Sequence, residues 1–530
     1  MAELKNLGIM LDCSRDAVYT VETLKRYMDL MARMGYNCLQ LYTEDTYTID
    51  DPYFGYLRGR YTPGELRELD RYALARGIEL VPCIQPLAHL SGYLRWNPDV
   101  VDCNDILLAG HEPTYALIEK MFAACADCFT SRRINIGMDE AHMVGLGKYL
   151  DKHGFENRFE IIRRHLVRVT QIAEKYGFRP MMWSDMFFRL ANNGEYYCTG
   201  ESRIPEDVIA LVPENLQLVY WDYYSVDKSH FDHMISAHKQ FRNEIVFAGG
   251  AWSWTGFVPR NDFSIRSNEA AIRSCLENGV EDVLITCWKD DGGECSLFAS
   301  LPCMFFTARM AQGVFDREIL EREFEDFFGV PYDLFLTLED AELCDPRELA
   351  NPCKYMLYSD PFVGFMDWTV DPEKTGLLRQ AKNALKTVPD NEYSYLFETL
   401  SALMTVLERK YPLGYQLRKA YREGNRPELS RLAEECFAIR DDVKSLHKAF
   451  FRQWMAECKP YGFEKHTLRL GGLALRLEEC ASRIRSYLDG EAEAIPELSE
   501  DILPCQQDVP AGKAVSENLW FYISSVKPMM

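Results

Sequence analysis

The chain has 530 residues, of which 47% are hydrophobic and 26% charged, and this is the composition of an ordinary globular protein. Its formal net charge of −22 at pH 7 disfavours a surface that follows nucleic-acid phosphates, so we expect no nucleic-acid partner. Because one hydrophobic core seldom organises so long a chain, we expect at least two domains.

The first residues, MAELKNLGIMLDCSRDA, lack the basic flank and apolar stretch of a secretory signal peptide. No run of about 18 apolar residues follows, so no membrane contact is expected. The 17 cysteines are scattered, and only Cys125 and Cys128 have the Cys-x-x-Cys spacing, with no second pair to complete a zinc site. These features indicate a cytoplasmic protein with reduced thiols and without a metal or other cofactor.

Eight short apolar runs in the first 300 residues predict β-strands, at 7–12, 36–42, 77–83, 133–138, 180–184, 216–221, 244–249 and 283–287. Segments with a helical apolar period separate them. The first two, 21–35 and 63–77, end in Gly, which is favoured where a helix stops. Eight alternating units predict an α/β fold, namely a closed (β/α)8 TIM barrel over 1–314. An open doubly wound sheet is less well supported, because the Gly-rich phosphate turn typical of that fold is missing from the sequence.

From about residue 315 onward the strand signals stop and apolar residues recur at helical spacing, as at Leu396, Leu400, Leu403 and Leu407. This pattern predicts a C-terminal all-helical domain over 315–530. Within it, the proline-containing segment 343–375 and the acidic segment 489–515 are expected to be irregular. The apolar stripes predict a core or a surface packed on the barrel or on another subunit, so a homodimer is a candidate assembly.

The residues that follow the strands are the informative ones, because a TIM barrel takes its catalytic groups from the carboxyl ends of its strands. Five of the nine tryptophans follow strands: Trp183, Trp221, Trp252, Trp254 and Trp288. So do ten acids: Asp12, Glu44, Asp45, Asp139, Glu140, Asp185, Asp222, Asp290, Asp291 and Glu294. Tryptophan rings stack on the apolar faces of a sugar while carboxylates bind its hydroxyls, so the predicted ligand is a small carbohydrate.

The fourth predicted strand runs into Gly137-Met-Asp139-Glu140. This stretch resembles the Gly-x-Asp-Glu motif of glycoside hydrolase family 20, the β-N-acetylhexosaminidases. The likeness is closest to the compact bacterial N-acetylglucosaminidase branch, in the patterns LYTEDTY, PYFGYLRGRYT, Gln-x-x-x-His and WxDDGxECS. It covers about 1–310 and, more loosely, the helical tail. One departure is expected: because the first predicted strand starts almost at Met1, we expect no counterpart of the α/β domain that precedes the barrel in many members.

The resemblance implies an exo-acting enzyme that removes a terminal β-linked GlcNAc or GalNAc with retained configuration, the substrate's own 2-acetamido group being the nucleophile. Glu140 would be the general acid/base, which must hold a proton near neutral pH. Asp139 would orient the acetamido N–H and stabilise an oxazolinium-like intermediate. Tyr223, or failing it Tyr224, would bind the acetamido carbonyl, and strand alternation favours Tyr223.

The resemblance also suggests the substrate-binding residues. Arg15 and Asp290 would bind hydroxyls on the far edge of the sugar, although Arg15 could instead pair with a structural acid. His89 is preferred over His142 as the residue that tunes the acid pair. The full predicted set is Arg15, His89, Trp183, Trp221, Trp252, Trp254, Trp288, Asp290 and Glu294, with Glu44 and Asp45 as further rim contacts.

Two other functions stay open. A metal-dependent barrel hydrolase could use His89, Asp139, Glu140, His142 and Asp185 as ligands, although no His-x-His follows the first strand. A non-catalytic sugar-binding barrel would keep the tryptophans but would need no acid at position 140.

Overall fold

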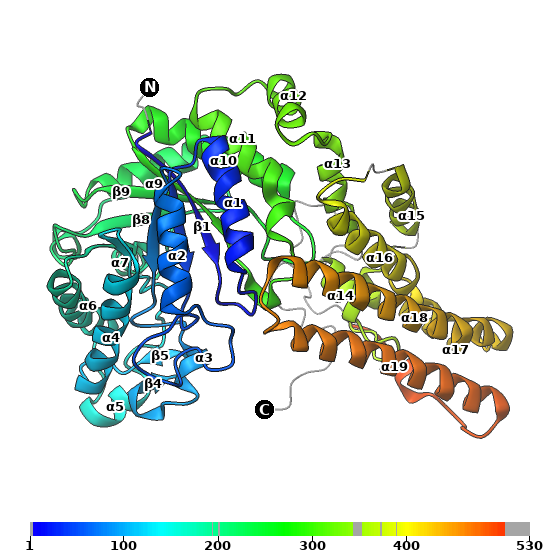
Figure 1. Cartoon of the computed structure of the whole chain (residues 1–530). Helices are drawn as coiled ribbons and strands as arrows, with labels where there is room; N and C mark the ends of the chain where they lie inside the picture. The colour runs from blue at the N-terminus through cyan, green and yellow to red at the C-terminus, as the bar shows by residue number, and fades with distance from the viewer. Residues whose placement is uncertain are drawn as a thin grey trace. The chain divides into compact units, whose positions relative to one another are not determined.

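The computed structural model of the protein describes residues 4–192, 194–199, 202–342, 352–371, 374–387 and 390–503. They form two compact units (Figure 1). The barrel unit comprises Met1–Ala251, Ser264–Trp288 and Cys303–Leu320, and the helical unit comprises Trp252–Phe263, Lys289–Pro302 and Glu321–Met530. The helical unit therefore includes two segments from the part of the sequence that was expected to form the barrel.

Eight parallel strands close into a barrel in the order β1-β10-β9-β8-β7-β6-β3-β2, which confirms the predicted TIM barrel. The strands are β1 (Asn6–Asp12), β2 (Cys38–Tyr42), β3 (Glu79–Cys83), β6 (Arg133–Asn135), β7 (Arg179–Trp183), β8 (Gln217–Trp221), β9 (Ile245–Gly250) and β10 (Asp282–Cys287). β1 closes the sheet, since Gly8 is in register with Cys38 of β2 and with Leu284 of β10. β6 ends three residues earlier than the sequence predicts.

Buried side chains from the barrel strands form one cluster. The buried cluster consists of Met10, Tyr42, Cys83, Met181, Trp183, Val219, Val246, Ala248 and Leu284, with Trp221 and Trp288 packed partly buried against it. Strands that are covered on both faces need apolar side chains on both, which explains why they read as nearly continuous apolar runs in the sequence. Trp221 and Trp288, at or just after the ends of β8 and β10, connect this cluster to the strand ends.

Helices separate the strands: α1 (Val21–Met34), α2 (Pro63–Leu74), α4 (Glu112–Cys128), α6 (Arg158–Lys175), α7 (Asp185–Ala191), α9 (Lys228–Lys239), α10 (Asn261–Asn278) and α11 (Leu301–Ala311). Thr20 caps the start of α1, and Gly35, with a φ of 97°, ends it as expected. Thr62 and Glu65 form a capping box at the start of α2. That helix ends at Leu74 rather than at Gly77.

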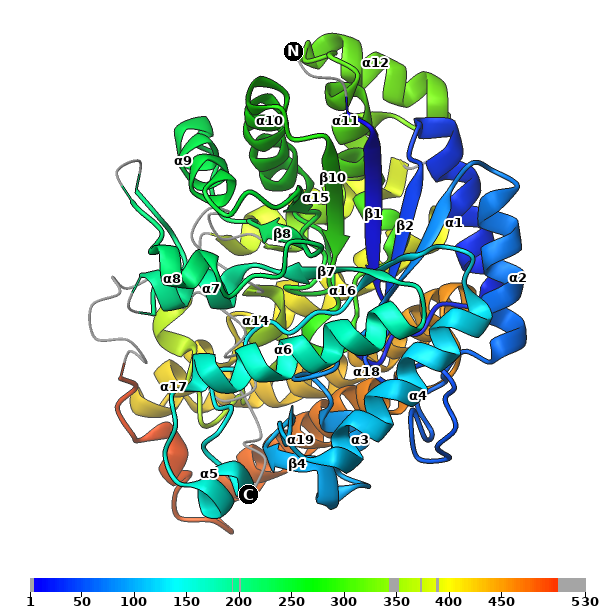
Figure 2. The ribbon, with the colours of Figure 1, turned by 90° about the vertical axis from the view of Figure 1, so that its left-hand side faces the viewer.

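Short elements occupy the loops that follow β3 and β6: α3 (Ser91–Leu94), β4 (Val101–Cys103), β5 (Ile106–Leu107) and α5 (Lys148–His153). Figure 2 shows α3 and β4 beyond the carboxyl end of β1. A further short helix, α8 (Glu206–Ile209), precedes β8. The carboxyl rim of the barrel is thus built up by structured loops.

The helical unit confirms the predicted helical region. Its helices are α12 (Arg317–Phe328), which spans the unit boundary, α13 (Tyr332–Leu336), α14 (Pro352–Tyr358), α15 (Thr375–Ala384), α16 (Ser394–Lys410), α17 (Leu413–Arg422), α18 (Arg426–Glu457) and α19 (Phe463–Asp489). The long helices α18 and α19 run side by side (Figure 1). None of the helices in the described part of the chain is long and apolar enough to cross a membrane.

The two segments expected to be irregular are partly ordered. Pro352 begins α14, because proline is well suited to the first turn of a helix. The second segment holds only a short 3-10 turn at Pro496–Leu498 among its described residues. Residues 343–351, 372–373 and 504–515 of these segments lie outside the described residues.

Candidate active site

The turn that follows β6 has an unusual backbone. Gly137, Met138 and Glu140 have φ values of 58°, 64° and 51°. A Cβ atom at Gly137 would overlap the Gln85 side chain, so only glycine fits there. The Met138 N–H donates to Gln85 Oε1 at 3.2 Å and helps to hold the turn. Left-handed residues other than glycine cost about 1–3 kcal/mol each and concentrate at functional sites.

Asp139 is anchored from two sides. Gln85 Nε2 donates to Asp139 Oδ1 at 2.9 Å and also lies 3.1 Å from the Tyr42 hydroxyl. His89 Nε2 lies 3.3 Å from Asp139 Oδ2. Burial works to raise the pKa of Asp139, but the His89 charge and the Gln85 hydrogen bond together hold this pKa below its ordinary value. Asp139 is therefore a carboxylate at neutral pH.

His89 carries the opposite charge. Its backbone N–H donates to Asp105 Oδ2 at 3.1 Å, and its backbone is left-handed, with a φ of 60°. Burial works to lower the pKa of His89, but the Asp139 carboxylate outweighs this and raises the pKa to about 9. His89 is thus an imidazolium at neutral pH, and its Nε2 also lies 3.9 Å from Glu140 Oε2.

Glu140 differs from its neighbour in exposure. Its side chain is 50% exposed, against 13% for Asp139. The Glu140 N–H lies 3.5 Å from Asp185 Oδ2. Asp185 is fully buried, and burial together with the charges of Asp139 and Glu140 raises its pKa to about 7. Of the two adjacent acids, Asp139 is therefore a fixed, charged carboxylate, whereas Glu140 is an accessible carboxyl group.

His89, Asp139 and Glu140 also lie close enough to share a metal ion, since one ligand atom from each falls within 4.8 Å of the others. A histidine binds a metal through a neutral ring. The pairing with Asp139 keeps His89 protonated at neutral pH, which works against that role. His142 is exposed overall, but partial desolvation of its ring and, to a smaller extent, the Arg189 charge lower its pKa.

Aromatic side chains form a wall beside the acids. Trp288 Nε1 donates to the Tyr223 hydroxyl at 3.2 Å, and the Trp221 ring stacks on Tyr223 at 5.5 Å. Trp288 meets the edge of Tyr42 at 4.8 Å, and Tyr42 shares the Gln85 amide with Asp139. The wall and the acid pair are thereby connected through direct contacts.

The other aromatic residues differ in exposure. Tyr223 is 6% exposed, whereas Tyr224 is 54% exposed. Trp183 is 1% exposed, and its ring lies 6.0 Å from that of Trp288. Trp183 therefore supports the wall from the core rather than offering an open face to a ligand.

Arg15 and Glu44 form a second polar group at this rim. Arg15 Nε donates to Glu44 Oε1 at 2.9 Å, and the Tyr42 hydroxyl donates to the same oxygen at 3.1 Å. The Arg15 side chain stays 29% exposed. Arg15 thus has an acidic partner, as expected if its role is structural. It also stays exposed enough to bind sugar hydroxyls, as expected if it contacts the substrate. Asp45, the neighbour of Glu44, is buried and paired with Arg58.

Four predicted sugar ligands lie on segments of the helical unit. The rings of Trp252 and Trp254 are 5.0 Å apart, and Asp290 begins a 3-10 turn, Asp290–Gly292. Glu294 is buried, with Lys354 Nζ at 2.9 Å, and within this unit Arg469 and His466 follow at 3.5 and 3.9 Å. Such burial and pairing favour a structural role for Glu294 over the sugar contact that we expected.

Sequence reasoning gave no role to Gln85 and Tyr42, which organise the site, and it named Asp185 only as a strand-end acid and a possible metal ligand. Each had a signal, because Gln85 begins the Gln-x-x-x-His stretch, Tyr42 ends β2 and Asp185 follows β7. Only the structure shows that Gln85 contacts both Tyr42 and Asp139.

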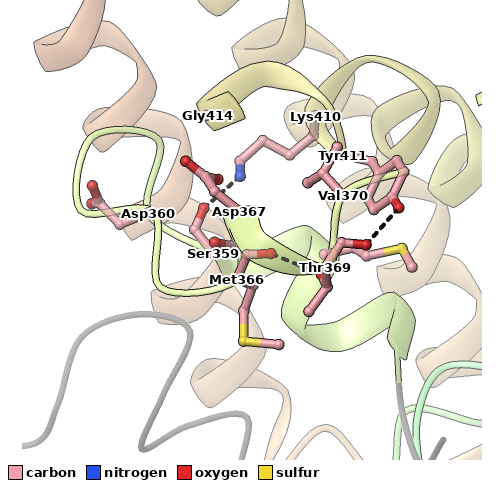
Figure 3. A pocket seen from close by; sticks show the side chains of 10 residues that line it. Ser359, Asp360, Met366, Asp367, Thr369, Val370, Lys410, Tyr411 and Gly414 are labelled. Carbon is pink, nitrogen blue, oxygen red and sulfur yellow. Dashed lines mark hydrogen bonds between the residues drawn. The ribbon is translucent and has the colours of Figure 1, made fainter. Parts of the chain in front are cut away.

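Two cavities lie elsewhere. One, in the helical unit, has a volume of about 10 Å³ and is lined by Asp367, Lys410 and Ser359, whose backbone oxygen accepts from Lys410 Nζ (Figure 3). This is space for one water molecule. The other, about 560 Å³ beside α4, contains none of the predicted site residues.

A closed TIM barrel with an acid pair and an aromatic wall after its strands is the architecture of the TIM-barrel glycoside hydrolases. Two family models match the chain: glycosyl hydrolase family 20, catalytic domain, over residues 7–233, and the glycoside hydrolase 20C C-terminal domain over residues 333–516. Together they cover more than half of the sequence. The chain belongs to glycoside hydrolase family 20.

Individual relatives are distant. Beta-hexosaminidase 1 of Coccidioides posadasii is 28% identical over 240 residues, which are 38% of this chain and 39% of that protein. Hexosaminidase D of Bos taurus is 22% identical over 277 residues, 49% of this chain and 73% of that protein. The crystal structure of an exo β-N-acetylglucosaminidase from Vibrio harveyi is similar with a TM-score of 0.47 and 15% identity, covering 62% of this chain and 58% of that one. The chain thus spans about two fifths of the length of the fungal relative.

Proposed function

We propose that the protein is an exo-acting β-N-acetylhexosaminidase that removes a terminal, non-reducing β-linked GlcNAc or GalNAc. The observation that carries the proposal is the contrast between two adjacent acids: Asp139 is charged and paired with His89, and Glu140 is accessible. Two carboxyl groups in different environments suit two different chemical roles.

In the proposed reaction the acetamido oxygen of the substrate attacks carbon 1, and the glycosidic oxygen leaves with a proton from Glu140. Water then attacks carbon 1 of the oxazolinium, gives its proton to Glu140 and displaces the acetamido oxygen, so that the configuration is retained. A retaining enzyme that supplies its own nucleophile needs two carboxyl groups about 5 Å apart on either side of carbon 1. Neighbouring residues on one turn suit the substrate-assisted route better.

The surroundings of each residue support its role. The Asp139 carboxylate would accept a hydrogen bond from the acetamido N–H. Its negative charge would also stabilise the positive charge that develops on the oxazolinium ring. The Tyr223 hydroxyl accepts from Trp288, and in the proposed complex it would donate its own hydrogen to the acetamido carbonyl. Trp221 and Trp288 would provide the apolar contact with the sugar ring, and Arg15 would bind its hydroxyls.

A panel of chromogenic β-glycosides with and without the 2-acetamido group tests the proposal. We expect rapid cleavage of the N-acetylglucosaminide or N-acetylgalactosaminide and almost none of the plain glucoside. Equal cleavage of the glucoside would contradict the proposed function. The relative rates on the two N-acetyl sugars would give the preference between the epimers.

We further propose a cytoplasmic location and a homodimer. The free thiols of the described cysteines, nearly all buried, support a reducing compartment. Leu468 and Leu475, seven residues apart on α19, are 74% and 70% exposed, which supports contact with a second copy. Cell fractionation and sedimentation of the purified protein test the two statements.

A further inference from the structure

Three exposed aromatic side chains of the barrel unit touch one another. Tyr53, Tyr56 and Trp96 are 51%, 44% and 45% exposed. Trp96 stacks on Tyr53 at 6.1 Å with an interplanar angle of 23°, and it meets the edge of Tyr56 at 5.6 Å. We call these three residues the aromatic platform. Single exposed apolar residues are common, but a contiguous group of large ones indicates a binding surface.

The platform rests on a packed layer. Beneath it, Phe54 contacts Tyr47 and Tyr93, each at 5.2 Å between ring centroids. The Tyr93 hydroxyl donates to Asp51 Oδ2 at 2.8 Å, and the Tyr53 N–H donates to Asp51 Oδ1 at 2.9 Å. The exposed rings are therefore carried by a fixed loop, which lowers the entropy lost when a ligand binds to them.

Both loops that carry the platform also carry residues of the candidate active site. The loop after β2 begins with Glu44, the partner of Arg15, and continues to Tyr53 and Tyr56. The loop after β3 contains His89, and Trp96 follows seven residues later. Because seven residues span at most about 25 Å when fully extended and α3 shortens this stretch, Trp96 lies less than about 25 Å from His89.

Arg58 fixes these loops to the rim. Its guanidinium donates to the buried Asp45 carboxylate and to the backbone oxygen of Ser14, the residue before Arg15. A Cβ atom at Gly92 in α3 would overlap the Arg58 side chain, so α3 packs directly on this arginine. The platform, Arg15 and the loop of His89 thus share one support.

We propose that the aromatic platform binds the sugar residues on the reducing side of the bond that is cleaved, so that the preferred substrates are oligosaccharides. This inference rests on the proposed function. An exo-acting enzyme encloses only the terminal sugar, and the remainder of the chain must pass over the rim, where Tyr53, Tyr56 and Trp96 offer flat apolar faces with polar edges. The nearby Arg58 and Asp45 are paired with each other, which suits a neutral ligand.

Steady-state kinetics of Trp96→Ala and Tyr56→Ala test the proposal with two substrates, an aryl β-N-acetylglucosaminide and a tetramer of β-1,4-linked GlcNAc. We expect KM for the tetramer to rise by about tenfold in Trp96→Ala, the effect of losing one well-placed aromatic contact, with kcat unchanged. KM for the aryl glycoside should change much less, because its single aryl group is the only part that extends beyond the cleaved bond. Trp96→Phe should recover most of the affinity because it restores an aromatic face.

Leu74→Ala is the matched control. Leu74 is 50% exposed and ends α2, which runs back from the rim, so it lies at the opposite end of the same βα unit. This variant should behave as the parent on both substrates. An equal loss in Leu74→Ala and Trp96→Ala would mean a general loss of stability and would overturn the proposal.

Calorimetry on a Glu140→Gln background measures binding of the tetramer without turnover. If adding Trp96→Ala weakens this binding by about tenfold, the proposed role of the platform is supported, and unchanged binding overturns it. Failure of the parent to cleave the aryl N-acetylglucosaminide would instead refute the proposed function. If Trp96→Ala converts a dimer into a monomer in sedimentation and leaves tetramer binding unchanged, the surface is an interface between two copies and the proposal is wrong.

Discussion

His89 Nε2 lies 3.3 Å from Asp139 Oδ2, and this contact joins an imidazolium to a carboxylate at the carboxyl rim of the barrel. Each group shifts the pKa of the other: that of His89 is raised to about 9 and that of Asp139 is lowered. The pair therefore keeps Asp139 charged over the pH range in which an N-acetylhexosaminidase would work.

Replacing His89 should alter both stability and the pH profile. The folded protein raises the pKa of His89 above its unfolded value of about 6.5, so the stabilisation is complete below that pH and is lost as the pH rises through about 9. Urea unfolding of the parent and His89→Gln should differ most at pH 6 and converge at pH 10. A stability difference that grows with pH would contradict the assigned charge.

The same variant removes the cation that lowers the pKa of Asp139. We expect the acid limb of the kcat/KM profile to move to higher pH, because Asp139 then needs a higher pH to ionise. An unshifted acid limb would show that Asp139 ionisation does not control the reaction.

Glu140→Gln should show a dependence on the leaving group. Turnover of a glycoside with a poor leaving group should fall by about 10²–10⁴-fold, the usual contribution of general acid catalysis. An activated aryl glycoside needs little protonation and should lose much less. Equal losses on both substrates would mean that Glu140 is not the acid.

Gly137→Ala should disturb the turn that presents both acids. Gly177, also at positive φ but without a neighbouring atom, is the control, and Gly177→Ala should cost about 1 kcal/mol for the left-handed backbone alone. Gly137→Ala should lower the free energy of unfolding by more than Gly177→Ala does, and it should also reduce kcat. The reason is that the new Cβ atom displaces Gln85 from Asp139. Equal effects of the two substitutions on stability and activity would refute this role of Gln85.

Much of this site follows from sequence. The barrel could be predicted because buried parallel strands leave an apolar signature, and the residues after each strand must share one rim. The interactions that organise the site could not be predicted, since Gln85 reaches Asp139 only through the closed barrel and the left-handed turn at Gly137. Glu294 shows the limit of strand-end reasoning: it follows β10 in the chain, yet it is buried in the helical unit and paired there with Lys354 and Arg469.

Treatment with EDTA separates the hydrolase that we propose from the metal-dependent alternative. The protonated state of His89 predicts unchanged activity after chelation and dialysis. Loss of activity that zinc or manganese restores would favour a metal held by His89, Asp139 and Glu140.

The affinity of a thiazoline mimic of the oxazolinium tests most directly whether the nucleophile belongs to the substrate. The parent should bind this mimic at least about 10²-fold more tightly than GlcNAc, as expected for an analogue of a stabilised intermediate. Asp139→Asn keeps the side-chain shape but removes the opposing charge, and it should lose most of that difference. Equal affinity of the parent for the mimic and for GlcNAc, or an Asp139→Asn variant that binds the mimic as tightly as the parent, would contradict the proposed mechanism.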